Sequence, residues 1–350
     1  KQKNMQILHY VHSLSFSPDG KYLATPGEYQ SLLVWDVATG EKIKTFSVPM
    51  KRQDAFSPHT VLFSNNGKML AVATDASLDG WVTLFDFDSG RILQQIKLSS
   101  PRALAFSPND QHLAVGDAVK TITIFDTQTG RGIKTLRIEM GLKSVFSSGN
   151  LVAYSPDGKY FASGSEDDLI RIWDAKDYHH IRTFRGHTSP ITSLAFAREG
   201  AFLLSASWDT TARIWNLPNG ESISMVRFET GDYFNFTHDA YFDSTRDGGN
   251  YISILKGTES YAPDQFALLK NRPDIILKRI GLAPQDMIEH FYAQYQKRLK
   301  KSKLSEKQLS LETHVPEAKI ISSVQNNKTV ELRFSLADSK FSLSHYNIYV

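Results

Sequence analysis

The sequence predicts a mainly β fold, a β-propeller of six visible blades or seven, followed by a short helical segment and a partial β-sandwich-like module. Two short sequence motifs, called phrases below, recur together along the chain and predict the propeller. A change of pattern near Lys256 predicts the two parts that follow it. Internal repeats of this length decide the whole architecture of a chain.

The first phrase is an aromatic residue, then Ser or Thr, then a Pro/Asn/Asp/Gly turn, and then an apolar strand. It begins at Phe16, Phe63, Phe106, Tyr154 and, in a weaker copy, Phe196, with steps of 47, 43, 48 and 42 residues. Such turn residues supply the φ values that tight hairpins need. Each copy therefore predicts an antiparallel hairpin.

The second phrase is a β-branched strand that ends in an aromatic residue followed by Asp or Asn. Its five copies are Trp35-Asp36, Phe85-Asp86, Phe125-Asp126, Trp173-Asp174 and Trp215-Asn216. With both phrases, each unit holds about four short strands. A four-stranded unit of roughly 40–45 residues is typical of a propeller blade, which buries its faces against neighbouring blades.

These repeats resemble the WD-repeat family over about 1–255, and the fifth unit resembles it most. In that family a His, a Ser or Thr, an Asp and a Trp form a hydrogen-bonded structural tetrad. The resemblance assigns these roles to His187, Ser205, Asp209 and Trp215. The fourth unit keeps the same spacing, without Gly-His, in Ser163, Asp167 and Trp173. The resemblance thus implies a structural role for His187.

The other units depart from that pattern. The first has Tyr29 at the Asp position, and the third has Val119 there. A degraded sixth unit begins at Phe236 and predicts strands at 240–242 and 251–255. It lacks an outer strand, which we expect residues 4–9 to supply, because such an exchange would close the ring and remove exposed sheet edges.

Three domains are predicted: the propeller over 1–256, a helical linker segment over 257–312, and a partial immunoglobulin-like β module over 313–350 that is truncated. Proline, an acid in the first turn and apolar residues at three- and four-residue spacing predict the helices after Pro273 and Pro284. Strands are expected at 319–324, 329–335 and 345–350.

The composition limits the chemistry that the chain can support. There are 40 basic and 37 acidic residues and no cysteine, which excludes disulfides, thiolate metal sites and cysteine nucleophiles. No apolar run approaches the ~18 residues of a membrane span and no signal peptide is visible, so we expect a cytoplasmic location. Enzyme motifs are absent, and we expect no cofactor, no metal site and no catalytic residue.

The candidates for partner binding lie in turns at the propeller rim. Trp208, next to Asp209, either packs on a neighbouring loop or is an exposed aromatic anchor for a protein or peptide. Tyr29 and Glu166 are expected at the corresponding rim position of other blades. The acidic run from Glu166 to Asp168 is expected to form a turn. Lys297–Lys303 reads as a solvated helix end, so nucleic acid is not the expected partner.

The order of parts resembles the non-catalytic region that precedes the caspase-like peptidase in certain bacterial WD-repeat proteins. This resemblance implies a regulatory region with a catalytic domain beyond Val350, because caspase-like catalysis needs a cysteine. The expected function is a non-catalytic protein interaction scaffold or sensor. The alternatives are a propeller enzyme whose loops supply the active site, and a nucleic-acid-binding adaptor that uses Lys297–Lys303.

Overall fold

The computed structural model describes residues 13–27, 30–49, 58–74, 80–118, 121–138, 151–197, 200–256, 258–303, 306, 317–326 and 329–337. The chain divides into two compact units. The first comprises residues 1–226 together with 279–281, and the second comprises 227–278 together with 282–350.

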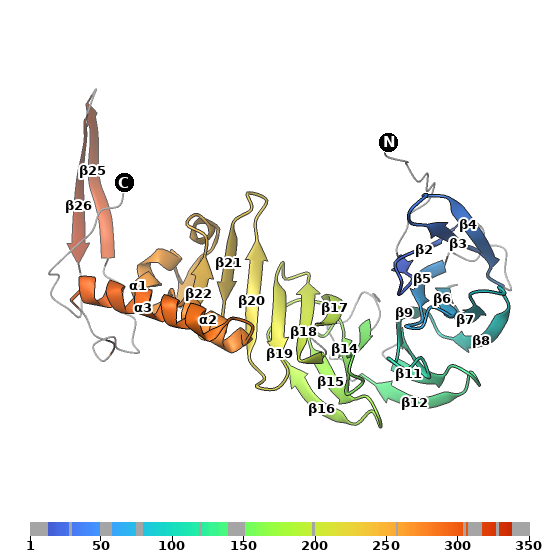
Figure 1. The fold of residues 1–350 in the computed structure, drawn as a ribbon. Coiled ribbons are helices and arrows are strands. Elements are labelled where there is room, and N and C mark those ends of the chain that lie inside the picture. The colour runs from blue at the N-terminus through green and yellow to red at the C-terminus, as the bar shows by residue number, and fades with distance from the viewer. Residues whose placement is uncertain are drawn as a thin grey trace. The chain divides into compact units, whose positions relative to one another are not determined.

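The first unit contains five successive groups of four antiparallel strands, named blades one to five here, which can be followed by their labels in Figure 1. The strands of blades one to three are β1 (Ser15–Phe16), β2 (Tyr22–Pro26), β3 (Ser31–Asp36), β4 (Lys42–Ser47), β5 (Pro58–Phe63), β6 (Met69–Thr74), β7 (Gly80–Asp86), β8 (Ile92–Leu98), β9 (Pro101–Phe106), β10 (His112–Asp117), β11 (Thr121–Asp126) and β12 (Gly132–Arg137). Those of blades four and five are β13 (Leu151–Tyr154), β14 (Tyr160–Gly164), β15 (Ile170–Asp174), β16 (His180–Phe184), β17 (Ile191–Ala197), β18 (Phe202–Ser207), β19 (Ala212–Asn216) and β20 (Ser222–Arg227). The predicted blade architecture is confirmed.

The turn between the third and fourth strands of each blade needs a residue in the left-handed backbone region. Glycine takes this position in four blades, as Gly40, Gly90, Gly130 and Gly220. In blade four it is Tyr178, at φ 61°, where a side chain costs about 1–2 kcal/mol. The Tyr178 side chain is buried, and its hydroxyl lies 2.7 Å from the Tyr154 hydroxyl and 2.8 Å from His112 Nδ1. These contacts offset the backbone strain.

The hydrophobic core of this unit consists of four clusters, each lying between consecutive blades. We call the face that a blade turns to its predecessor the leading face, and the opposite face the trailing face. On the trailing faces of blades one to four, alanine recurs at one register position and is fully buried. These residues are Ala24, Ala71, Ala114 and Ala162. A small residue there lets the next sheet pack closely.

The two ends of the series differ from its middle. Phe16 on the leading face of blade one is 53% exposed, whereas its equivalent in blade two, Phe63, is 5% exposed. On the trailing face of blade five, Leu204 replaces the recurring alanine and is 37% exposed. Among the described residues, therefore, neither of these faces is covered as the internal faces are.

The last blade of this unit also binds a short segment from further along the chain. The side-chain amide of Asn216 donates to the carbonyls of Arg279 (3.3 Å) and Ile280 (3.4 Å). The Arg279 guanidinium lies 3.6 Å from the Glu221 carboxylate. An aspartate, which stands at this position in blades one to four, cannot donate to carbonyls. The Asn at the end of β19 is thereby explained.

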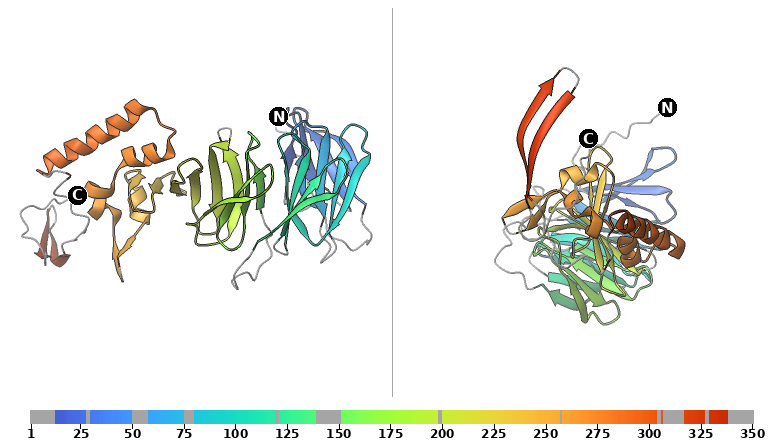
Figure 2. Two further views of the ribbon diagram at one scale, coloured as in Figure 1. Left: turned by 90° about the horizontal axis from the view of Figure 1, so that it is seen from below. Right: turned by 90° about the vertical axis from the view of Figure 1, so that its left-hand side faces the viewer.

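The second unit combines short hairpins with helices. Its elements are β21 (Tyr233–Phe236), β22 (Phe242–Ser244), η2 (Gly248–Tyr251), β23 (Ile254–Lys256), β24 (Glu259–Tyr261), η3 (Pro263–Phe266), α1 (Ala267–Lys270), α2 (Pro273–Ile280), α3 (Gln285–Lys301), β25 (Glu317–Asn326) and β26 (Thr329–Ala337). Residues Arg279–Gly281 at the end of α2 belong to the first unit. Figure 2 shows α3 and the long β25–β26 hairpin from two further directions.

Parts of the predicted sixth unit are present. β21 and β22 pair as a hairpin. β22 begins at Phe242, so the strand expected at 240–242 is wrong at residues 240 and 241, which lie in the connection between the two strands. The strand expected at 251–255 does not join them, because η2 ends at Tyr251 and β23 pairs with β24 instead. The exchange strand expected at 4–9 and the last expected strand at 345–350 lie outside the described residues. Closure of the ring and the predicted domain boundaries stay predictions.

The helices of the second unit pack around a stacked arginine. The Arg272 guanidinium lies 3.8 Å from the centre of the Tyr295 ring of α3 and forms two hydrogen bonds, of 2.9 and 2.8 Å, with the Asp274 carboxylate of α2. Arg298 of α3 donates to the carbonyl of Asn271. These charged side chains thus add hydrogen bonds and a cation–π contact to the packing of the buried Ile276 and Leu299.

Candidate functional site

Blade five brings the four predicted tetrad residues into one hydrogen-bonded chain. The Trp215 indole donates to the Ser205 hydroxyl over 2.8 Å, and Ser205 Oγ lies 2.7 Å from His187 Nε2. On the other side of the imidazole, His187 Nδ1 lies 2.7 Å from an Asp209 oxygen. These four hydrogen-bonded side chains link strands β18 and β19 to the loop that precedes β17.

These bonds are compatible with one tautomer of neutral His187. Ser205 accepts from the indole and can give its own proton to Nε2, and a proton on Nδ1 can go to Asp209. This pattern fits a neutral imidazole with both nitrogens engaged. Burial lowers the pKa of His187, although the Asp209 hydrogen bond acts in the opposite direction. Burial raises the pKa of Asp209, but bonds from Thr211, His187 and the backbone outweigh it and lower that pKa to about 2.

Blade four forms only part of this chain. The Trp173 indole donates to Ser163 over 3.0 Å, as in blade five. Asp167, however, accepts from the Arg171 guanidinium at 2.6 and 3.3 Å instead of from a histidine. Arg213 is the equivalent arginine of blade five, and it donates to the Gly186 carbonyl over 2.8 Å. Sequence reasoning missed both arginines, although each stands two residues before the tryptophan.

The glycine before His187 has a packing reason. A Cβ atom at Gly186 would collide with the Arg213 guanidinium and would lie 3.3 Å from the Trp215 ring.

In blade one the Trp35 indole donates to the Thr25 hydroxyl over 2.9 Å, so the Trp–hydroxyl bond extends to a third blade. In blade three, Asp117 accepts from the backbone and the hydroxyl of Thr121.

Trp208 is an exposed aromatic side chain on a fixed turn. It follows β18, and its side chain is 60% exposed. Its backbone N–H donates to the Pro190 carbonyl over 3.0 Å, and the preceding Ser207 hydroxyl donates to the Ser189 carbonyl over 2.7 Å. Of the two alternatives for this residue, the exposed aromatic anchor fits this exposure better, and it stays a prediction.

Glu166 lies beside the same loop, on the blade four side. The Ile191 N–H, next to Pro190, donates to the Ser165 carbonyl over 3.3 Å. Segment 189–191 is therefore bonded to the Trp208 turn and to the residue before Glu166. Tyr29 lies outside the described residues. Counted from Thr25, it corresponds to Asp209 rather than to Trp208, which Glu28 matches.

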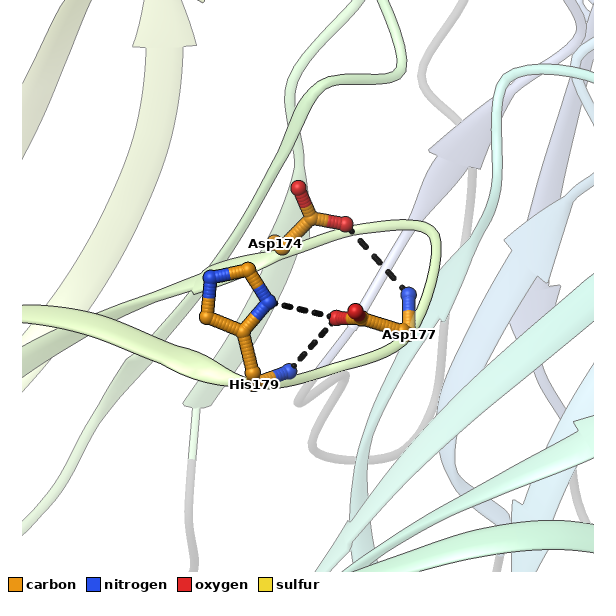
Figure 3. Close-up of side chains that lie close together, drawn as sticks. All are labelled: Asp174, Asp177 and His179. Carbon is orange, nitrogen blue, oxygen red and sulfur yellow. Dashed lines mark hydrogen bonds and ion pairs between the residues drawn. The ribbon is translucent and has the colours of Figure 1, made fainter.

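The turn after β15 gathers Asp174, Asp177 and His179, whose ligand-type atoms all lie within 4.8 Å of one another (Figure 3). Asp174 accepts the backbone N–H of Lys176 and, over 3.3 Å, that of Asp177. Asp177 Oδ1 accepts the backbone N–H of His179 and lies 2.6 Å from its Nδ1. The first of these roles recurs in blade three, where Asp126 accepts the N–H of Thr129. We interpret this cluster as a turn.

Comparison with known proteins identifies the repeats. The family model described as "WD domain, G-beta repeat" matches residues 3–36, 150–174 and 178–216. Over these three ranges the chain is similar to WD40 repeats. Two of the three matched ranges contain the Ser–Trp bonds of blades four and five. No helix among the described residues is long and apolar enough to cross a membrane.

The curated relatives match a part of this chain. WD repeat-containing protein VIP3 of Arabidopsis thaliana is 35% identical over 113 residues, 29% of this chain and 34% of that protein. The small ribosomal subunit protein RACK1 of Medicago sativa is 40% identical over 90 residues, 25% and 24% of the two chains. Protein HIR1 of Eremothecium gossypii is 30% identical over 131 residues, 33% and 15%. The matched regions thus span about a third of these relatives or less.

Proposed function

We propose that this chain is a non-catalytic protein interaction scaffold and that it binds a protein or peptide at the rim formed by the turns of blades four and five. The observation that carries the proposal is Trp208, which is 60% exposed on a turn whose backbone is bonded to the neighbouring loop. Tryptophan is enriched among the residues that dominate interface energies. An anchor held in place before binding loses little conformational entropy when a partner arrives.

The relatives support a scaffold role. The similar protein from Medicago sativa is named a small ribosomal subunit protein, and that name places it in an assembly of many components. The state of His187 supports the absence of catalysis. Its side chain is fully buried and both of its nitrogens are engaged, so a substrate could not reach it.

The experiment compares Trp208→Ala with Ile181→Ala, a control at another exposed apolar side chain of the first unit. Each full chain is purified from the source cells under gentle crosslinking, and bound proteins are quantified by mass spectrometry. We expect at least one partner to be retained by the parent and by Ile181→Ala but reduced about 30-fold or more by Trp208→Ala, as for a hot-spot residue. Equal recovery by all three chains would refute the proposal.

We also propose a finer role, as the regulatory region of a caspase-like peptidase within a longer polypeptide. The support is the order of parts, in which WD40 repeats precede the Arg272–Pro273 helix start and the β25–β26 hairpin. The native protein should then exceed the 39.4 kDa of this chain and react with a cysteine-directed peptidase probe. A native protein of matching mass that the probe leaves unlabelled would contradict this role.

A further inference from the structure

We propose that the outer circumference of blades one to four binds an extended acidic peptide segment that also carries aliphatic side chains. This surface is separate from the turn that holds Trp208. The third strand of each blade runs between two turns, and Trp208 lies in the turn before such a strand, whereas the proposed surface begins at the turn after it. The inference therefore goes beyond the proposed function and adds a second binding surface.

The outermost strand of each of these four blades contains an extra residue. The pairing between the third and fourth strands shifts by one residue at the same place in all four blades, which is a β-bulge. The extra residue is the second of the outer strand and is aliphatic each time: Ile43, Leu93, Ile133 and Ile181. Their side chains are 43%, 43%, 47% and 44% exposed, respectively.

Blade five shows that a blade does not require this exposure. Its outer strand β20 pairs with β19 without a shift, and Ile223, the second residue of β20, is 1% exposed. An aliphatic side chain at the same place is thus buried where the bulge is absent. The bulges of blades one to four present apolar groups to solvent at one repeated position.

The four positions follow one another around the first unit. β4, β8, β12 and β16 are edge strands of their sheets, and in Figure 1 they follow one outer edge of this unit. In blades one and four, the residue after the bulge reaches the next blade. Lys44 donates to the Phe87 carbonyl over 2.7 Å, and Arg182 donates to the Leu217 carbonyl over 3.2 Å. The exposed aliphatic groups therefore lie beside contacts that join successive blades.

The charge of the four strands selects the partner. The strands contain no aspartate or glutamate, and their lysines and arginines are Lys42, Lys44, Lys97, Lys134, Arg137 and Arg182. The carbonyl partners of Lys44 and Arg182 are neutral, so both side chains keep their charge. An acidic partner complements these strands, whereas the same strands of a second copy would repel them.

The bulges also determine how such a partner binds. A bulge and lysines on an edge strand oppose the addition of another strand, so backbone pairing along the whole edge is disfavoured. The aliphatic and charged side chains remain available for contact. A flexible acidic segment can follow a curved edge over several blades, and each contact raises the effective concentration for the next. A flat lipid surface would reach only part of this edge.

The test is a peptide-display selection with the immobilised full chain as bait and a library of random peptides as the probe. The bait carries Trp208→Ala, so that the site of the proposed function does not select peptides. We expect enrichment of peptides that combine acidic and aliphatic residues. In fluorescence anisotropy titrations, Leu93→Ser combined with Ile133→Ser should weaken the selected peptides about 10-fold. Arg137→Glu should weaken them about 3-fold.

Two variants of the second unit serve as matched controls. Leu255→Ser replaces a leucine that is 73% exposed, and Lys301→Glu reverses an exposed charge at the end of α3. Both should leave the affinity unchanged, and urea unfolding checks that every variant is folded. If Lys301→Glu weakens binding as much as Arg137→Glu, the preference comes from overall charge and the inference fails.

Three other results would also overturn the inference. They are a selection that enriches no peptide, enriched peptides without an excess of acidic residues, and full affinity in the folded variant that carries Leu93→Ser and Ile133→Ser. Because the bait lacks Trp208, none of these results bears on the proposed function, which depends on its own experiment.

Discussion

Blades four and five share one backbone plan but satisfy their buried aspartates in different ways. In both, a tryptophan indole donates to a serine hydroxyl on the neighbouring strand. In blade five, Asp209 binds His187, which links the blade to the loop before it. In blade four, Asp167 binds Arg171, four residues away, and the bond stays within one turn and its strand.

The difference shows that the hydroxyl–indole bond and the aspartate bond are separable parts of a blade. The hydroxyl–indole bond joins two neighbouring strands of a blade, and it occurs with or without a histidine. The aspartate bond determines which side chain holds the turn that contains the aspartate. An arginine partner remains charged at every accessible pH, whereas a histidine partner is neutral in its buried state. The two blades should therefore respond differently to charge removal and to acid.

The largest expected effect comes from removing one carboxylate charge in each blade. Asp167→Asn leaves the Arg171 guanidinium nearly buried without a counter-charge, which should cost about 3 kcal/mol of unfolding free energy. Asp209→Asn leaves a neutral imidazole, which should cost about 1 kcal/mol. Urea unfolding followed by tryptophan fluorescence measures both costs in the first unit, because all five tryptophans lie within residues 1–226.

Double substitution gives the control for this comparison. Combining Asp167→Asn with Arg171→Met removes both charges and should restore part of the lost stability. If Asp209→Asn proves as costly as Asp167→Asn, the two aspartates have equivalent environments and the contrast between the blades is wrong.

A smaller effect is expected at another difference between the blades, Asn216 in place of Asp174. Asn216→Asp removes two donors to the carbonyls of Arg279 and Ile280 and places a negative charge beside a helix C-terminus. This should cost about 2 kcal/mol and increase hydrogen exchange at residues 279–281. The reciprocal change Asp174→Asn keeps the acceptor for Lys176 and should have little effect. Unchanged exchange in Asn216→Asp would argue against the attachment.

The smallest effect concerns mild acid. Because the pKa of His187 is lower in the folded state than its ordinary value of 6.5, the stability it contributes is complete above pH 6.5 and is lost as the pH falls through the folded pKa. His187→Gln does not titrate, so the difference in stability between pH 7.5 and 5 should be smaller in this variant than in the parent. His179→Gln, at an exposed histidine, should behave as the parent does. An identical difference in His187→Gln and in the parent would exclude His187 as its source.

The repeats were predictable because each blade is specified locally. The turn after Phe16 depends on residues that favour its φ values, and the Trp215-Asn216 motif depends on the residue pattern of one strand. Both kinds of motif recur in every unit. The Ser205–His187–Asp209 contacts followed from a family resemblance that includes spacing. Nothing in the spacing of Arg171 indicates that its long side chain reaches Asp167, because strand neighbours do not determine the direction of a flexible chain.

Three further features could not be predicted from the linear pattern. Tyr178 stands where the other blades have glycine, and its hydroxyl contacts Tyr154 in another strand of blade four and His112 in blade three. The strand expected at 251–255 instead became part of a local hairpin, because β24 follows closely enough to pair with β23. The exposure of Trp208 could be suspected from its turn but was decided by the structure.

The recurring alanine of the trailing faces has a consequence for protein engineering. Blades one to four each present a buried alanine at the same position of the trailing face. One of these blades could therefore be duplicated in tandem, and the following blade would still pack against an alanine. Leu204 gives blade five a different trailing surface, because a leading face that fits alanine would clash with the larger side chain. A designer who lengthens this array should insert copies of blade four and leave blade five as the last of the series.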